Sequence, residues 1–127
     1  MANTRQTGRQ GENAACDWLT SNGYTIVRRN YTAPHGEIDI IAEDEKYIVF
    51  AEVKFRKSSA HISRFGRPVK AVTKEKKQHV ISAVKHYLRQ VGTDKKPRID
   101  VIEIIGNQEA DGFVSLSIKH YKNAFGE

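Results

Sequence analysis

Apolar residues recur at helical spacing in two segments of the chain, and β-forming residues gather in five others. From Thr7 to Asn22 the apolar positions lie three or four residues apart, and Gly23 follows as a residue suited to a left-handed helix end. A second helix is expected after Thr73, whose side chain can cap it. Its apolar stripe comprises Val80, Ile81, Val84, Leu88 and Val91. Strands are expected at residues 24–31, 37–42, 47–55, 99–105 and 113–121.

The connections between these elements are polar, and no internal repeat interrupts them. Residues 43–46 form a turn short enough to join the strands on either side into a hairpin, and residues 58–67 form a longer polar loop. The order helix, three strands, helix, two strands predicts an α/β fold with a mixed central sheet flanked by helices. A chain of 127 residues fits one domain, so we expect residues 1–127 to form a single unit.

Charged residues of the expected hairpin fall on shared faces of its two strands. Residues two apart on a strand point the same way, as Glu37 and Asp39 do on one strand and Glu52 and Lys54 on the next. Residues 48–51 are apolar on both faces, which indicates a central strand covered on both sides. If Asp39 lies opposite Glu52, paired positions sum to 91 and the charges can meet, whereas a slip of one residue separates them. The sequence leaves this register open.

Carboxylates that converge beside an ammonium suit a divalent cation and a phosphate substrate. Mg²⁺ takes one or two carboxylates and keeps water in the rest of its shell, and it can polarise a phosphate and acidify an attacking water. Lys54 would then position this water or stabilise charge in the transition state. The alternative is an internal salt bridge of Lys54 with Glu52 or Asp39 that holds the end of the sheet.

Glu12 adds an acid on the first expected helix. It shares the apolar face with Ala15 and Leu19, where an acid is unusual. Gly8 and Gly11 beside it permit a close approach of the backbone. One interpretation of Glu12 is an extra ligand or orienter for the metal, and the other is a first-turn acid favoured by the helix dipole.

The charge balance favours a polyanionic partner. Lysine and arginine number 21 against 15 acids, which gives a net charge of +6. A basic cluster around the start of the second helix could neutralise nucleic-acid phosphates, and the alternative is a solvated helix face. Its members are Arg56, Lys57, Arg64, Arg67, Lys70, Lys74, Lys76 and Lys77.

Other classes of site are excluded by the sequence. The single cysteine, Cys16, allows no intramolecular disulfide and no CxxC metal site, and the five histidines show no ligand spacing. No stretch approaches the roughly 20 apolar residues of a membrane helix, and residues 1–10 lack an apolar signal region. We therefore expect a cytoplasmic protein without a membrane anchor.

A series of motifs in order resembles the YraN-like family of uncharacterised bacterial proteins. The hairpin carries GEIDIIA at 36–42 and FAEVKFR at 50–56. The likeness spans nearly the whole chain, and its other segments are GRQGE (8–12), RNY (29–31), RFG (64–66), AVT (71–73), RIDV (98–101) and HYKNAF (120–125).

This family is similar in turn to archaeal Holliday-junction resolvases and to the restriction-endonuclease-like, or PD-(D/E)xK, superfamily. That similarity implies a core of αβββαβ topology and a site of the form Asp…Glu-x-Lys. Ile38 departs from the superfamily, which often has Pro before the first Asp, and Glu37 belongs to the family's own motif without an assigned role. Carried over by position, the metal ligands are Asp39, Glu52 and the Val53 carbonyl, and the catalytic residues are Asp39, Glu52, Lys54 and Glu12.

From these residues we expect a Mg²⁺- or Mn²⁺-dependent endonuclease that hydrolyses phosphodiester bonds in DNA, with branched or damaged DNA as candidate substrates. The alternative is a non-catalytic nucleic-acid-binding module with the same fold, and a third reading is an interaction protein that binds no nucleic acid. A resolvase-like activity would imply a homodimer, of which the sequence carries no signature. The residues expected to contact nucleic acid are Arg56, Arg64, Arg67, Lys70, Lys74 and Lys77.

Overall fold

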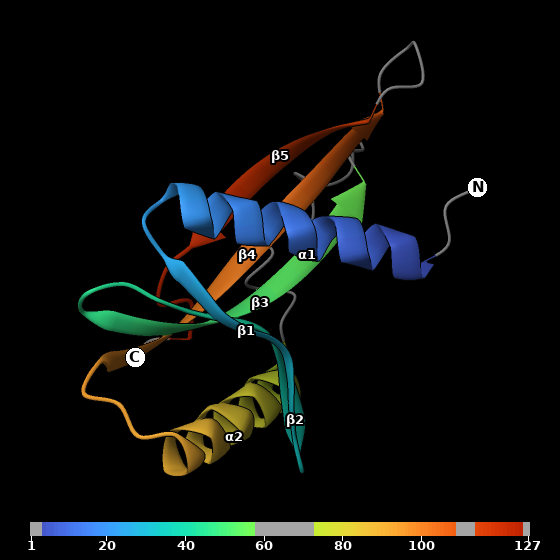
Figure 1. Ribbon diagram of the computed structural model, residues 1–127. Helices are drawn as coiled ribbons and strands as arrows, with labels where there is room; N and C mark the ends of the chain where they lie inside the picture. Colours follow the sequence, from blue (N-terminus) through green and yellow to red (C-terminus); the bar gives the residue numbers. More distant parts are fainter. Residues whose placement is uncertain (1–3, 58–72, 109–113, 126–127) are drawn as a thin grey trace.

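The elements of the chain follow the order that the sequence predicts (Figure 1). The computed structural model describes residues 4–57, 73–108 and 114–125, with side chains described within 11–56, 73–106 and 117–125. The predicted mixed α/β fold is confirmed. The elements are α1 (Thr4–Ser21), β1 (Thr25–Ala33), β2 (Gly36–Glu43), β3 (Tyr47–Lys57), α2 (Lys74–Gln90), β4 (Lys96–Gln108) and β5 (Val114–Tyr121).

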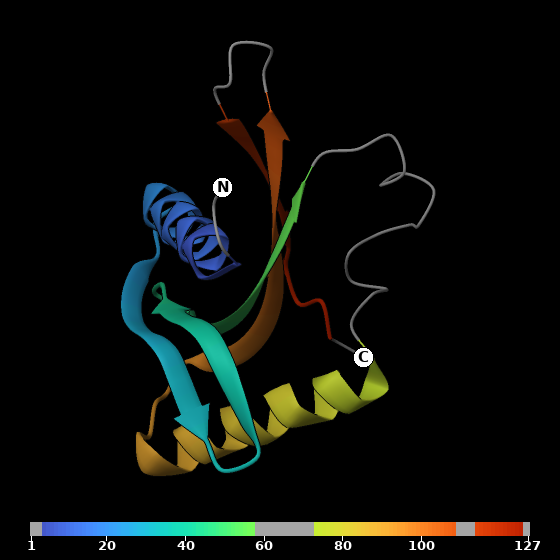
Figure 2. The same ribbon diagram turned by 90° about the vertical axis from the view of Figure 1, so that its right-hand side faces the viewer.

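A five-stranded sheet in the order β1-β2-β3-β4-β5 is covered by one helix on each face (Figure 2). β3 and β4 run parallel, joined through α2, and the other neighbours run antiparallel. On β3, Ile48 and Phe50 belong to the core under α2, while Val49 and Ala51 belong to the core under α1. All four are at most 2% exposed. The prediction of a central strand covered on both faces is confirmed.

The buried face of α2 differs from the predicted stripe. Ala83 and Tyr87 complete the buried face that begins at Val80. Ile81 is 36% exposed and Val91 is 48% exposed, so the prediction of both as stripe residues is wrong. Ile81 is turned about 100° around the helix from Val80, and that step takes it off the face toward the sheet. Val91 is the C-cap, with φ −118° and ψ 51°, and lies beyond the last helical turn.

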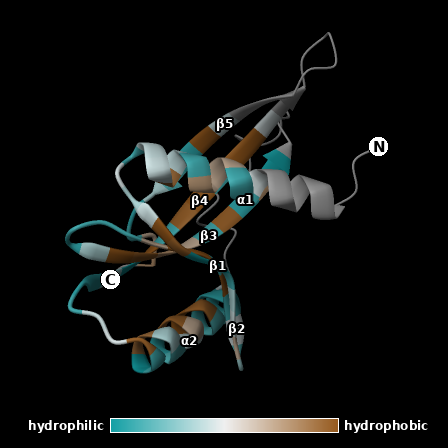
Figure 3. Cartoon of the chain, in the orientation of Figure 1, coloured by the Kyte–Doolittle hydropathy of each residue, from teal (hydrophilic) through white to brown (hydrophobic). Residues whose placement is uncertain are grey.

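The helix ends that rest on local chemistry are confirmed. Thr73 caps α2, and its Oγ1 accepts a hydrogen bond from Lys76 N at 3.0 Å. Gly23 follows α1 with φ +90°, in the left-handed region that favours glycine. Among the described residues, no helix combines the length and the apolar character needed to cross a membrane. In Figure 3 the hydrophobic colour gathers on strands of the sheet and on part of α2.

A buried polar network joins α1, β4 and β5 at one end of the sheet. Asp100 is 0% exposed and accepts hydrogen bonds from Arg98 Nε and Nη2, both at 2.9 Å, and from Asn123 N at 2.9 Å. Trp18 Nε1 donates to His120 Nδ1 at 3.1 Å, so the ring hydrogen of His120 lies on Nε2 and is shared with Asp100 at 2.7 Å. The carboxylate of Asp100 is thereby fully hydrogen-bonded. The network, which includes Trp18 of α1, fixes α1 against the sheet.

Candidate functional site

The hairpin of β2 and β3 has the register that brings its charged residues together. Ile40 pairs with Ala51, so paired positions sum to 91. The next step along the hairpin places Asp39 beside Glu52, and Asp39 Oδ2 accepts a hydrogen bond from Val53 N at 2.8 Å. The register that the sequence left open is therefore the one that a shared site requires.

Burial and mutual repulsion act together on the two carboxylates. Burial and the charge of Glu52 raise the pKa of Asp39 to about 7, against the hydrogen bond from Val53 N. Burial also raises the pKa of Glu52, while the charges of Lys76 and Lys54 lower it. Two acids this close favour a shared proton or a cation between them. We call Asp39 and Glu52 the acidic pair.

The ion pair of Glu52 comes from α2. Lys76 Nζ lies 3.4 Å from Glu52 Oε1, while Lys54, on the same strand as Glu52, acts on it through its charge. The alternative of a salt bridge from Lys54 to Glu52 or Asp39 is therefore wrong in its cation, because the ion pair of Glu52 is with Lys76. Sequence reasoning missed this role and placed Lys76 in the basic surface cluster. The available signal was helical spacing, because Lys76 precedes Val80 by four residues and so continues the buried face of α2.

Glu12 reaches the acidic pair from α1. Its charge contributes to the raised pKa of Asp39, and its Oε1 is buried without a hydrogen bond within the described part of the chain. Arg29 Nη2 lies 3.6 Å from this oxygen. The interpretation of Glu12 as a first-turn acid is wrong, because α1 begins at Thr4 and its first turn carries no acid. Gly11 lets α1 come close to β3, since a Cβ there would lie 3.1 Å from Phe55 Cδ2.

The turn of the β1–β2 hairpin packs directly on the backbone of α2. A Cβ at Gly36 would lie 2.3 Å from the carbonyl oxygen of His79, so only glycine fits there. A groove opens at this contact, lined by Thr32, Ala33, Gly36, Glu37, Lys76 and His79. Glu37 lies close enough for its charge to raise the pKa of Glu52. Two residues that line the groove, Glu37 and Lys76, therefore act on the acidic pair through their charges.

The expected nucleic-acid contacts fall into three groups. Arg64, Arg67 and Lys70 lie outside the described residues. Lys74 is exposed in the first turn of α2, and Lys77 Nζ lies 5.6 Å from the ring centroid of Phe125. Arg56 Nε lies 3.2 Å from Glu103 Oε2, and the Glu103 side chain is only 1% exposed. Arg56 therefore compensates a buried acid on β4, a role that the sequence did not reveal.

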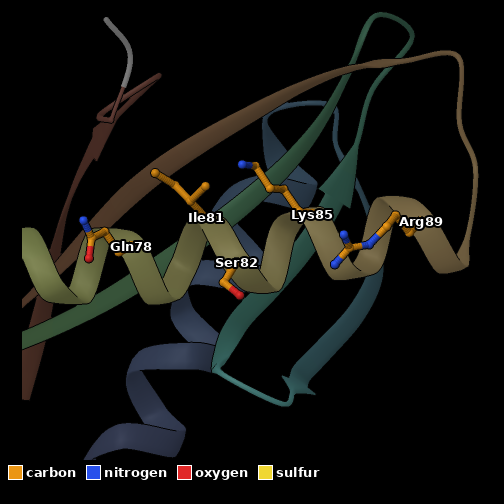
Figure 4. A pocket seen from close by; sticks show the side chains of 5 residues that line it. All are labelled: Gln78, Ile81, Ser82, Lys85 and Arg89. Atoms are coloured by element: carbon orange, nitrogen blue, oxygen red, sulfur yellow. The ribbon is translucent and has the colours of Figure 1, made fainter.

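The outer side of α2 carries a shallow pocket of its own. Figure 4 shows its side chains along one side of the helix, with two cations at the carboxyl-terminal part. We call this set the α2 strip. Its members are Gln78, Ile81, Ser82, Lys85 and Arg89.

The donors of the acidic pair fit a hard divalent cation with an open shell. Among the described residues, no group of three or more His, Cys, Asp or Glu side chains could hold a metal ion. Mg²⁺ needs only one or two carboxylates, because water and substrate phosphate complete its octahedral shell. Asp39 and Glu52 supply two carboxylates, and Glu12, whose Oε1 is buried without a hydrogen bond within the described residues, acts on Asp39 through its charge.

The fold and the site define a small mixed α/β protein with an acidic pair where β2 and the central strand β3 part, and with one lysine from β3 and one from α2 beside it. The model of the uncharacterised protein family UPF0102 matches residues 11–104, and the chain belongs to this family. The YraN-like resemblance is thus confirmed at the level of the family. The matched segment contains Glu12, Asp39, Glu52 and Lys54.

Relatives described as UPF0102 proteins match most of the chain. One from Desulfosudis oleivorans is 40% identical over 127 residues, which cover 98% of this chain and 94% of the relative. One from Chlorobium phaeobacteroides is 40% identical over 120 residues, with 93% and 92% covered. One from Caldicellulosiruptor bescii is 43% identical over 104 residues, with 80% and 84% covered.

Proposed function

We propose that this protein is a Mg²⁺-dependent endonuclease of the restriction-endonuclease-like superfamily that hydrolyses phosphodiester bonds in DNA. The observation that carries the proposal is the meeting of Asp39, Glu52 and Lys54 where the pairing of β2 with the central strand β3 ends, and where the two acids repel each other. The αβββαβ order of the elements and the Asp…Glu-x-Lys pattern support the superfamily. Branched or damaged DNA is the candidate substrate class.

Asp39 and Glu52 would hold the metal, with the Val53 carbonyl as the candidate third ligand and Mn²⁺ as an alternative ion. A bound divalent ion would supply polarisation of the phosphate and acidification of an attacking water. Asp39 is kept in place by the hydrogen bond from Val53 N, so its second oxygen remains available to a ligand. Glu52 is held by a strand that is buried on both faces.

Lys54 would stabilise the negative charge that grows on the phosphate oxygens during hydrolysis. In this reaction the water oxygen forms a new bond to phosphorus, and the bond from phosphorus to one sugar oxygen breaks. The water loses one proton, and the leaving sugar oxygen gains one, without oxidation or reduction. Glu12 would orient water or metal ligands beside Asp39, because its buried Oε1 has an unused acceptor position.

A non-catalytic nucleic-acid-binding module is the second candidate function. The α2 strip favours it, because Lys85 and Arg89 offer cations away from the acidic pair, and the net charge is +6. Under either function the protein would act in the cytoplasm, where a lone cysteine such as Cys16 stays reduced. Resolution of a junction would further require a homodimer with two sites.

The test is metal-dependent cleavage of linear, flapped and four-way-junction DNA at low and moderate salt. The wild type is compared with Asp39→Ala, Lys54→Ala and the surface control Lys46→Ala. Nuclease function predicts cleavage that needs Mg²⁺ or Mn²⁺, is lost in the first two variants and persists in the control. Salt-sensitive binding without cleavage, unchanged in all three variants, would establish the binding module instead.

A further inference from the structure

Lys76 links α2 to the acidic pair. Its Nζ lies 3.4 Å from Glu52 Oε1, and the exposed fractions of the two side chains are 34% and 8%. The ammonium therefore reaches a buried acid from the solvent side. Its charge acts on Asp39 as well as on Glu52. Lys76 compensates a carboxylate that would be costly to bury without a partner.

The ammonium of Lys76 can occupy a second position, although the backbone of Lys76 is fixed. The contact of Gly36 with the backbone of His79 holds the first turns of α2 against the hairpin. Lys76 also lines the groove beside Glu37 and His79. Its four-carbon stem is flexible, so the ammonium can leave Glu52 and enter this groove while the helix stays in place.

We infer that Lys76 is a placeholder cation that neutralises Glu52 in the metal-free protein and moves into the groove when a divalent cation binds, where it pairs with a phosphate oxygen of the nucleic acid. This inference rests on the proposed function, because it needs a divalent cation at the acidic pair. Both cations would draw on the negative charge of the Glu52 carboxylate, whose Oε1 Lys76 contacts, so each would weaken the binding of the other. Lys54 keeps its own position on β3 in both states.

Mn²⁺ binding without DNA tests the competition, measured by isothermal titration calorimetry and by the loss of the free-ion signal in electron paramagnetic resonance. Lys76→Met removes the charge and keeps the length, and it should bind Mn²⁺ about ten-fold more tightly than the wild type. Lys76→Arg keeps the charge and should stay within about two-fold of the wild type. Lys46→Met, at an exposed turn position, controls for the change in net charge. Thermal unfolding verifies that each variant is folded.

DNA binding in Ca²⁺ tests the second half of the inference. Lys76→Met should bind a four-way junction about ten-fold more weakly than Lys46→Met, although it holds Mn²⁺ more tightly. Unchanged or weaker Mn²⁺ binding by Lys76→Met would overturn the competition, and unchanged DNA affinity would overturn the phosphate contact.

Asp39→Asn separates this inference from the proposed function. If Mn²⁺ binding is lost in Asp39→Asn but is insensitive to Lys76→Met, the metal site stands and the placeholder role fails. If the wild type, Lys76→Met and Asp39→Asn all bind Mn²⁺ equally, both the metal site and the placeholder role fail.

Discussion

Asp39 is the residue on which the electrostatics of the site converge. Burial and the neighbouring Glu52 disfavour its ionised form, and one backbone hydrogen bond favours that form. The result is a pKa of about 7. A carboxyl group in this state is costly to ionise in the folded protein. A bound cation stabilises its ionised form.

The substitution Asp39→Asn should therefore stabilise the protein at high pH. The ordinary pKa of Asp39 is 3.8 and its folded value is about 7, so the wild type loses stability as pH rises through this interval. Asn keeps an acceptor for Val53 N and does not ionise. We expect a gain of about 2 kcal/mol in the free energy of unfolding at pH 8, which disappears near pH 4.

Urea denaturation at pH 4, 6 and 8 without divalent ions measures this difference. Asp94→Asn, at an exposed loop position, is the control and should show no such dependence on pH. An effect of Asp39→Asn that has the same size at all three pH values would contradict the electrostatic origin.

At the scale of elements, the site depends on how the hairpin docks on α2. Gly36 meets the backbone of His79 with no room for a side chain, and this contact places Lys76 next to Glu52. The docking joins segments far apart in the sequence, and it depends on the absence of a Cβ at Gly36.

Gly36→Ala should separate the hairpin from α2. Its Cβ would lie 2.3 Å from a backbone oxygen, and backbone cannot yield as a flexible side chain does. We expect a loss of about 1–3 kcal/mol in the free energy of unfolding and weaker Mn²⁺ binding. Gly92→Ala is the matched control, because a Cβ there meets nothing within 4 Å. Equal melting temperatures for the two variants would show that the contact does not constrain the fold.

The order of the elements could be predicted because each segment carries its own period and its own end signals. Thr73 and Gly23 mark helix ends by local chemistry alone. β4 extends over Lys96–Gln108, beyond the predicted 99–105, because its parallel pairing with β3 runs from Lys96 to Gly106 and its antiparallel pairing with β5 continues to Gln108. Such pairing between distant segments leaves no local pattern to read.

The candidate site could be predicted in part for the same reason. Strand alternation put Glu52 and Lys54 on one face of their strand, and helical spacing added Glu12. The register that brings Asp39 to them stayed open in the sequence and is set by the pairing of β2 with β3. The position of Lys76 depends on the crossing of α2 over the hairpin. The pairing of Arg56 with Glu103 depends on the β3–β4 register. Neither arrangement follows from the spacing within one segment.

At the scale of the whole molecule, the charge is distributed between two regions. The acidic pair gathers negative charge where β2 and β3 part, while the net charge of +6 favours contact with polyanions elsewhere. The α2 strip places Lys85 and Arg89 on the outer side of the helix. A nucleic acid held there would lie on the helix that also delivers Lys76 to the site.

Loss of the two strip cations should reduce the salt dependence of DNA binding. We expect the double variant Lys85→Gln/Arg89→Gln to lower the slope of log K against log salt by about 2, because each phosphate contact contributes about 0.9. Fluorescence anisotropy of a labelled duplex in EDTA measures the slope. Lys46→Gln/Lys119→Gln removes the same charge from exposed positions elsewhere. Equal slopes for both double variants would exclude the strip as a DNA contact.

Cleavage of a labelled four-way junction by the wild type and by Asp39→Asn tests the central claim most directly. The variant keeps the size of the side chain and an acceptor for Val53 N, so we expect it to fold as the wild type does. We predict Mg²⁺-dependent cleavage by the wild type and none by Asp39→Asn. Cleavage that survives this substitution, or a wild type that binds the junction without cutting any strand in Mg²⁺ or Mn²⁺, would contradict a nuclease site at Asp39 and Glu52.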